Sequence, residues 1–227
     1  NSIASTPHID SLASSGAIFD SAYTNFPLCA PSRFSMMAGQ LASTIGAYDN
    51  GAEFPSSIPT FAHYLRNLDY QTCLVGKMHF VGADQLHGFE QRLTTDIYPG
   101  DFGWTGDWTE VRPSFANYAV TFTNAGVCLR NVQLEYDDEV CHRARRKIYD
   151  LARGNDERPF KLFTTFTHPH DPCQCRPEQW DRYRHEDIDM PVGNTAQDEM
   201  EPYSLRLMAQ YALKDKPPSE DQVRVAR

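Results

Sequence analysis

The sequence predicts an α/β fold in which a mostly parallel sheet is covered by helices. Segments with the apolar spacing of an amphipathic helix alternate along the chain with short, continuous apolar runs. The run 70–75 follows a helical segment at 60–68, and the run 160–167 follows a helical segment at 140–151. Parallel strands are joined by such crossover helices, so this alternation favours a parallel sheet.

Residues with strong start and stop preferences bound the helical segments. Proline fits the first turn of a helix, Ser and Thr cap its start, and glycine often ends it. In chain order the signals are Thr6-Pro7 with Gly16, Pro31 with Gly39, Thr60, Gly154, and the capping box Ser219-Glu220-Asp221-Gln222. The two longest apolar stripes are Phe61, Tyr64, Leu65 and Leu68, and then Val140, Ala144, Ile148 and Leu151.

The run 160–167, FKLFTTFT, is nearly continuous in aromatic and β-branched residues. Such a composition is typical of a strand that is buried on both faces of a sheet. By contrast, residues 81–130 are rich in Gly, Pro and aromatic residues and show little periodicity. They predict long loops, and long ordered loops in compact domains usually carry function.

Composition and charge exclude several classes of protein. The 227 residues include 21 Lys and Arg against 30 Asp and Glu, and the net charge of −9 argues against a nucleic-acid partner. No apolar run reaches the roughly 18 residues of a membrane span, and no secretory leader opens the chain. The even count of six cysteines also fits disulfides of a secreted protein, but reduced thiols of a soluble, cytoplasmic protein are the favoured interpretation. Cys173-Gln174-Cys175 lacks the second half of a zinc site.

The segment from Cys29 to Arg33 places a thiol and a guanidinium at a predicted helix start. The N–H groups and the positive dipole end of a helix N-terminus favour an anion. Arg33 adds a forked cation that suits a tetrahedral oxyanion. The same residues also fit a buried structural cysteine beside a structural arginine. A loop of the tyrosine-phosphatase type is excluded, because too few residues separate Cys29 from Arg33.

Two further polar clusters directly follow the predicted strands. The residues GKMH come after the run 70–75, and HPHDP comes after the run 160–167. Ligands of open α/β sheets bind outside the carboxyl ends of the strands. Each histidine taken singly also fits a structural role, but together the clusters predict one shared anion site. Its residues would be Arg33, Lys77, His79 and His168.

The string Cys29-Ala30-Pro31-Ser32-Arg33 matches the sulfatase signature Cys-x-Pro-Ser-Arg, and the sequence resembles that family from about Ser5 to about residue 190. The segments YDNGAEFPSSIPTFAHYL, GKMHFVGADQLHGFEQRLTTDIYP and FTHPHDP look closest to choline sulfatases. The resemblance implies an alkaline-phosphatase-like sulfatase fold that is incomplete here. Residues 1–227 are expected to form part of the catalytic domain, without its first metal-binding strand and its C-terminal half.

The resemblance also implies a covalent mechanism. A formylglycine-generating enzyme would oxidise Cys29 to formylglycine, and the hydrated aldehyde would attack the sulfur of a sulfate ester. By the same match, Arg33 would stabilise the diol and His79 would assist proton movement. Lys77 and His168 would hold the sulfate oxygens. A divalent cation, Ca²⁺ or Mg²⁺, would polarise the ester, and residue 29 is the only ligand that this chain offers it.

The choline branch predicts an aromatic part of the site. A trimethylammonium group donates no hydrogen bond, so aromatic faces and nearby carboxylates hold it best. By the family match Trp104 is the expected wall of such a cage, in a loop that also contains Tyr98, Phe102 and Trp108. These aromatic residues equally fit a structural role. Asn117-Tyr118 stands where the choline branch is expected to carry a His-Asn pair, so the sequence departs from the choline pattern at this point.

Three functions remain open on the sequence. The first is hydrolysis of a sulfate ester, with choline-O-sulfate as the favoured small-molecule substrate. The second is a phosphonate or phosphate monoester hydrolase that uses the same formylglycine, since the anion pocket suits both tetrahedral groups. The third is an inactive, truncated fragment without the metal ligands. The sequence does not determine the oligomeric state and is compatible with a homo-oligomer.

Overall fold

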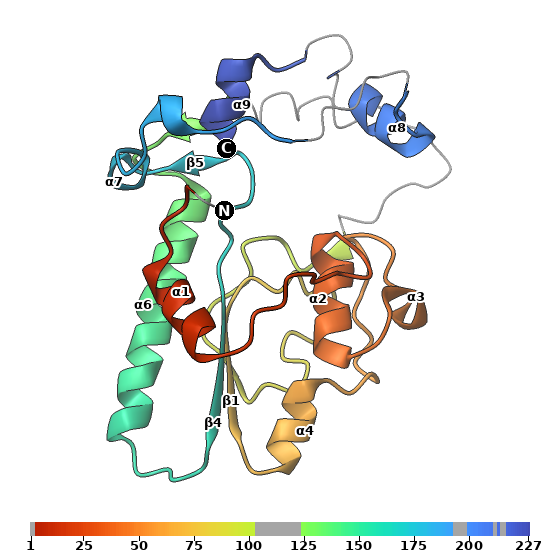
Figure 1. Cartoon of the computed structure of the whole chain (residues 1–227). Coiled ribbons are helices and arrows are strands. Elements are labelled where there is room, and N and C mark those ends of the chain that lie inside the picture. Colours follow the sequence, from red (N-terminus) through yellow and green to blue (C-terminus); the bar gives the residue numbers. More distant parts are fainter. Residues whose placement is uncertain (1–2, 103–123, 193–198, 211–212, 214–216) are drawn as a thin grey trace. The chain divides into compact units, whose positions relative to one another are not determined.

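The fold is described from a computed structural model of the chain (Figure 1). It describes residues 3–102, 124–192, 199–210, 213 and 217–227. The chain divides into two compact units, which we call the sheet unit and the terminal unit. The sheet unit comprises Ala22–Asp107 and Val132–His168, and the terminal unit comprises Asn1–Ser21, Trp108–Asn131 and Pro169–Arg227.

The sheet unit contains the predicted parallel sheet. Among the described strands, β1 (Gln71–Gly76) lies between β2 (Gln91–Arg92) and β4 (Phe160–Thr165), and both pairings are parallel. β1 and β4 pair in register over all six residues of each strand. Their carboxyl ends therefore meet at one edge of the sheet, as the polar clusters after the two strands require.

Successive side chains of β1 point to opposite faces of the sheet. Helices pack against these side chains on both faces. These helices are α2 (Cys29–Ala38), α3 (Ala42–Ile45), α4 (Phe61–Asn67) and α6 (Val132–Arg153). Leu74 belongs to a buried cluster shared with α2, α3 and α4. Cys73 and Val75 instead pack with Val140 and Ala144, which lie one turn apart on α6.

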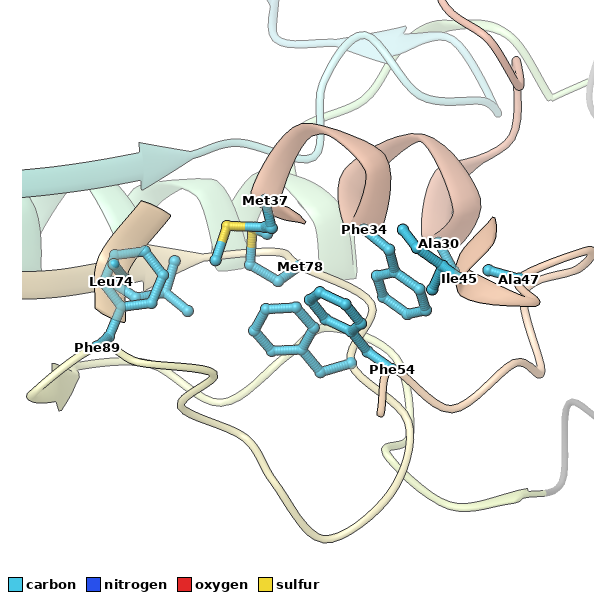
Figure 2. Packing of buried hydrophobic residues seen from close by; sticks show 11 residues of the cluster. Ala30, Phe34, Met37, Ile45, Ala47, Phe54, Leu74, Met78 and Phe89 are labelled. Atoms are coloured by element: carbon cyan, nitrogen blue, oxygen red, sulfur yellow. The ribbon is translucent and has the colours of Figure 1, made fainter. Parts of the chain in front are cut away.

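The larger core cluster anchors α2 to the segments around β1. Phe34 of α2 stacks on Phe54 with ring centroids 4.6 Å apart (Figure 2). Both rings also lie 6.2 Å from the ring of Phe80. Leu74 and Met78 belong to the same cluster. Burying one phenylalanine side chain contributes about 1.5–3 kcal/mol to stability. The position of α2, and hence of Cys29, is therefore fixed by apolar packing.

The terminal unit consists of short elements. β3 (Gly126–Val127) pairs in parallel with β5 (Gln174–Cys175). Its described helices are α1 (Pro7–Ser15), α7 (Pro177–Trp180), η2 (His185–Asp187), α8 (Pro202–Gln210) and α9 (Glu220–Ala226). The predicted capping box is confirmed, because Ser219 Oγ accepts from the N–H of Gln222 at 3.2 Å and Gln222 Oε1 accepts from the N–H of Ser219 at 2.9 Å.

The prediction that residues 160–167 are buried on both faces is wrong. Phe160 is 53% exposed, since β4 is an edge strand among the strands that the structure describes. The strand also ends earlier, at Thr165. Beyond Thr165, the N–H groups of Thr167 and His168 donate to the carboxylate of Asp137, which is distant in sequence, and not to a neighbouring strand.

The predicted helices exist but differ in detail. α6 begins at Val132, well before the apolar stripe that predicted it. In α4, Ala62 is fully buried, whereas Tyr64 and Leu68 of the predicted stripe are exposed. Within the described residues, no helix combines the length and apolarity needed to cross a membrane. All six cysteines lie in the described part of the chain and are free thiols.

His87 is a buried histidine of the main core region. It is 1% exposed, and its ring centroid lies 4.5 Å from that of Phe54 and 4.4 Å from that of Phe80. Burial lowers the pKa of His87 below its ordinary value, and Asp84, whose carboxylate is 3.3 Å from Nδ1, opposes this only in part. The fold therefore favours the neutral ring.

We predict that this neutral histidine makes the chain less stable in mild acid. The unfolded chain protonates His87 near pH 6.5, whereas the folded chain does so only at lower pH. The free energy that the neutral His87 contributes to folding is complete above about pH 6.5. Below that pH the free energy of unfolding falls, by at most about 1.4 kcal/mol per pH unit. Urea unfolding at about pH 7.5 and pH 5.5 measures the loss.

The control variants separate His87 from the other histidines. His87→Phe keeps an aromatic ring between its neighbours and should show a smaller loss of stability in acid than the wild type. His142 is exposed on α6, so His142→Gln should keep the wild-type loss. An unchanged pH dependence in His87→Phe would contradict the prediction.

Candidate anion site at the carboxyl edge of the sheet

The carboxyl ends of β1 and β4 approach each other closely at Gly76. This residue has φ +112°, and a Cβ atom on it would lie 1.8 Å from the carbonyl oxygen of Thr165. Only glycine tolerates both this φ and this approach. The N–H of Lys77 donates to the Thr165 carbonyl at 3.3 Å, and Thr165 Oγ1 donates to the Lys77 carbonyl at 2.6 Å. The end of β4 therefore fixes the backbone of Lys77.

Lys77 brings a buried ammonium group to the start of α2. The residue is 2% exposed, and its Nζ lies 3.9 Å from Sγ of Cys29. The same Nζ lies 4.6 Å from the centre of the Tyr98 ring, whose negative face stabilises a cation. Because a buried charge is costly without compensation, an ammonium in this position favours an anion beside it.

Arg33 connects α2 to the same backbone. It follows Cys29 by one helical turn, so both side chains project from the same face of α2. Its Nη1 donates to the carbonyl oxygen of Lys77 at 2.9 Å. At the start of the helix, the N–H of Ala30 donates to Oδ1 of Asn50 at 3.0 Å. Both the beginning and the first turn of α2 are thus held by hydrogen bonds at the site.

The surface beside Cys29 is hollowed. An open depression of about 450 Å³ lies there, and Cys29 is partly exposed. Its lining combines the thiol and a cation with apolar side chains, so it could accept a small molecule that has an anionic group and an apolar part. The lining residues are Pro27, Leu28, Cys29, Ser32, Arg33 and Met36.

A buried carboxylate, Asp96, shapes the segment after β1. It accepts hydrogen bonds from the N–H groups of Met78 at 2.8 Å and His79 at 2.7 Å, and it forms an ion pair with Arg92 at 2.9 Å. His79 has φ +60°, a conformation that costs a non-glycine residue free energy, and the two N–H bonds help to hold it. The ring of His79 then lies 5.0 Å from that of Tyr98.

A second carboxylate, Asp137 of α6, shapes the segment after β4. Its two oxygens accept the backbone N–H groups of Thr167 at 2.7 Å and His168 at 3.0 Å. Nδ1 of His168 also lies 2.7 Å from Oδ2 of Asp137. His168 therefore follows β4 in a fixed orientation, at the sheet edge where Lys77 follows β1.

A family model described as Sulfatase matches residues 1–212 of the chain. The chain belongs to the sulfatase family. This sulfatase chain is 48% identical over 228 residues to the choline-sulfatase of Rhizobium meliloti (strain 1021), covering 97% of this chain and 44% of that protein. It is 29% identical over 220 residues to an uncharacterized sulfatase of Escherichia coli (strain K12), covering 90% of this chain and 41% of that protein.

The sulfatase chain thus spans less than half the length of these curated relatives. Among solved structures, it superposes on a phosphonate monoester hydrolase from Silicibacter pomeroyi with a TM-score of 0.64 at 16% identity, covering 97% of this chain and 50% of that chain. At this identity the likeness concerns the fold alone. It confirms the predicted alkaline-phosphatase-like sulfatase fold, present here in part.

The structure brings several of the predicted site residues together. Cys29, Arg33 and Lys77 are linked by the contacts given above, and Tyr98 lies beside the side chains of both Lys77 and His79. His168 reaches the same sheet edge by way of β4. The predicted cage residues Trp104 and Trp108, together with Asn117-Tyr118, lie outside the described residues.

Sequence reasoning missed the residues that hold the site in place. Asp96, Asp137 and Asn50 all bind backbone N–H groups of site segments. No spacing rule connects Asp137 with His168, because the two residues meet only when α6 packs beside β4. Asp96 stands in the segment GKMHFVGADQLHGFEQRLTTDIYP, whose resemblance to choline sulfatases was the only available signal.

The described residues do not form a complete cation site. Among them, no group of three or more His, Cys, Asp or Glu side chains could hold a metal ion. Residue 29 would contribute one ligand, whereas Ca²⁺ takes roughly six to eight oxygen ligands. These residues therefore do not fit a resident divalent cation by themselves.

We predict that Gly76→Ala disrupts the edge on which the site is built. The added methyl group would collide with the Thr165 carbonyl and would also carry a strained φ, so the loss should be about 3 kcal/mol or more. Gly39→Ala is the matched control, since Gly39 has φ +65° but open space around it, and should lose about 1 kcal/mol. Urea unfolding compares the two, and equal losses would show that the close approach is unimportant.

Proposed function

We propose that this sulfatase chain supplies the nucleophile and the anion-binding groups of a sulfate-ester hydrolase. The observation that carries the proposal is the position of the motif cysteine. Cys29 begins α2, is partly exposed, and lies 3.9 Å from the buried ammonium of Lys77. A reactive group at a helix N-terminus beside a buried cation suits chemistry on an anionic substrate.

Residue 29 would act as formylglycine. In this modification the thiol-bearing carbon of Cys29 is oxidised to an aldehyde, and oxygen replaces sulfur. Hydrated formylglycine supplies an oxygen nucleophile that splits one difficult hydrolysis into two easier steps. The depression beside Cys29 gives a small ester a route to this atom. The modification requires a formylglycine-generating enzyme as a partner.

The positions of the remaining side chains suggest a separate role for each of them. Lys77 and His168 would hold the sulfate oxygens, since each follows a strand at the same sheet edge. Arg33 would stabilise the hydrated aldehyde, because it projects from the face of α2 that carries residue 29. His79, beside Tyr98, would move a proton at the same group. A divalent cation, Ca²⁺ or Mg²⁺, would need ligands in addition to residue 29.

The favoured substrate is choline-O-sulfate. Support comes from the 48% identity to a choline-sulfatase and from the apolar part of the depression, which Leu28 and Met36 line. Tyr98 stands beside Lys77 and so belongs to the anion end of the site. The resemblance to choline sulfatases makes Trp104 the proposed wall for the trimethylammonium group. A phosphonate or phosphate monoester is the alternative substrate, and paired sulfate and phosphate esters would distinguish them.

We predict that Cys29 carries the aldehyde in a longer natural reading frame that contains this chain, when it is expressed with a formylglycine-generating enzyme. The peptide spanning residue 29 should be about 18 Da lighter than its thiol form in mass spectrometry. Cys141 is exposed on α6 and provides an internal control, since its peptide should keep the thiol mass. An active enzyme with an unmodified thiol at residue 29 would overturn the mechanism.

A second prediction concerns Trp104 and the substrate class. A cation over an indole ring is worth about 0.5–2 kcal/mol, so Trp104→Ala should raise KM for choline-O-sulfate about three- to thirtyfold. An aryl sulfate should be affected less, because Arg33, Lys77 and His168 still hold its sulfate group. Lys77→Ala should weaken the binding of both substrates to the same extent. If Trp104→Ala impairs both esters equally, the residue only supports its loop.

A further inference from the structure

The carboxylate of Asp137 is fully engaged by the segment that follows β4. Oδ1 accepts the N–H of Thr167 at 2.7 Å, while Oδ2 lies 3.0 Å from the backbone nitrogen and 2.7 Å from Nδ1 of His168. The Asp137 side chain is 14% exposed and that of His168 is 27% exposed. Water therefore competes with these bonds only from one side.

The hydrogen-bonding chemistry of the pair determines where His168 carries its proton. An ionised carboxylate can only accept hydrogen bonds, so the short contact to Nδ1 requires an N–H on that nitrogen. When the imidazole is neutral, Nδ1 is then the protonated atom and Nε2 is not. Any proton that His168 gains or releases must therefore pass through Nε2.

We infer that Asp137 is a positioning residue which dedicates Nε2 of His168 to the substrate anion. It fixes the tautomer through Nδ1, and it fixes the ring by binding the N–H groups of the two peptide bonds that flank Thr167. The role toward the anion rests on the proposed function, whereas the tautomer is a property of the chain alone.

The helix that carries Asp137 is suited to this task. α6 packs on the sheet through Val140 and Ala144, which lie on the same side of the helix as Asp137, three and seven residues further along. The carboxylate is thus attached to a packed helix and not to a loop. A ring held by such a carboxylate keeps its orientation whether or not an anion is bound.

The tautomer can be measured without turnover. In a chain labelled with ¹⁵N-histidine, long-range ¹H–¹⁵N spectra distinguish a protonated Nδ1 from a protonated Nε2 in neutral imidazole. His168→Gln identifies the signals of residue 168 by their disappearance. We expect the Nδ1–H form in the wild type. A neutral His168 with its proton on Nε2 would overturn the inference, even in a fully active enzyme.

Asp137→Asn tests whether the carboxylate of Asp137 determines the tautomer of His168. Its amide has one accepting oxygen, which the backbone N–H groups need, and its NH₂ group would face Nδ1, so the proton should move to Nε2. Glu139→Gln removes a charge from an exposed position two residues along the same helix and should leave the tautomer unchanged. An unchanged Nδ1–H form in Asp137→Asn would show that the carboxylate only binds the backbone N–H groups and does not set the tautomer.

The effect on the anion needs the enzyme with formylglycine. The hydrogen bond to the sulfate group is donated by Nε2–H of a ring that carries both protons, because Nε2 of the neutral Nδ1–H tautomer can only accept. Removing the carboxylate that balances the charge of this ring should lower kcat/KM about 10- to 100-fold in Asp137→Asn, and Glu139→Gln should remain within about twofold of the wild type. A shifted tautomer with unchanged kcat/KM would remove the role toward the anion. No activity in the wild type, with the expected tautomer, would count against the proposed function alone.

Discussion

The close approach of β1 and β4 at Gly76 is the constraint on which the site depends. Because Gly76 has no side chain, the carbonyl oxygen of Lys77 comes within reach of both Thr165 and Arg33. Both lone-pair positions of that oxygen are thereby used. One atom thus joins the end of β1, the end of β4 and the first turn of α2. The distance between the Lys77 ammonium and Cys29 follows from these three attachments.

The segments that follow β1 and β4 are held by the same kind of interaction. Asp96 accepts two consecutive N–H groups after β1, and Asp137 accepts two consecutive N–H groups after β4. Each carboxylate has a further partner, which is Arg92 for Asp96 and His168 for Asp137. A carboxylate near an anion site would normally repel the ligand. Here its charge is largely compensated by donors, so it can organise backbone without opposing the anion.

The sequence was sufficient to predict the main helices and the two paired strands and to propose site residues, but not to predict the contacts that hold them. Periodicity and capping residues predicted α2, α4, α9 and the parallel pairing of β1 with β4, because these depend on local spacing and composition. The strand at 160–167 was predicted too long and too buried, since its end is set by Asp137, which is distant in sequence. Cys29, Lys77 and His168 could be proposed from motifs. The residues that position them could not, because hydrogen bonds between a side chain and backbone groups distant in sequence follow no spacing rule.

The charges beside Cys29 are positive, whereas the net charge of the whole chain is negative. The net charge is −9, yet the groups gathered around Cys29 include the cations Lys77 and Arg33. Charges separated by more than about 8–10 Å in water are largely screened by physiological salt, whereas a buried group acts on a neighbour in direct contact almost unscreened. Lys77, buried and 3.9 Å from Cys29, therefore outweighs a larger number of distant surface carboxylates. An acidic chain can in this way hold an anion, because burial and proximity, and not the sum of charges, determine the local potential.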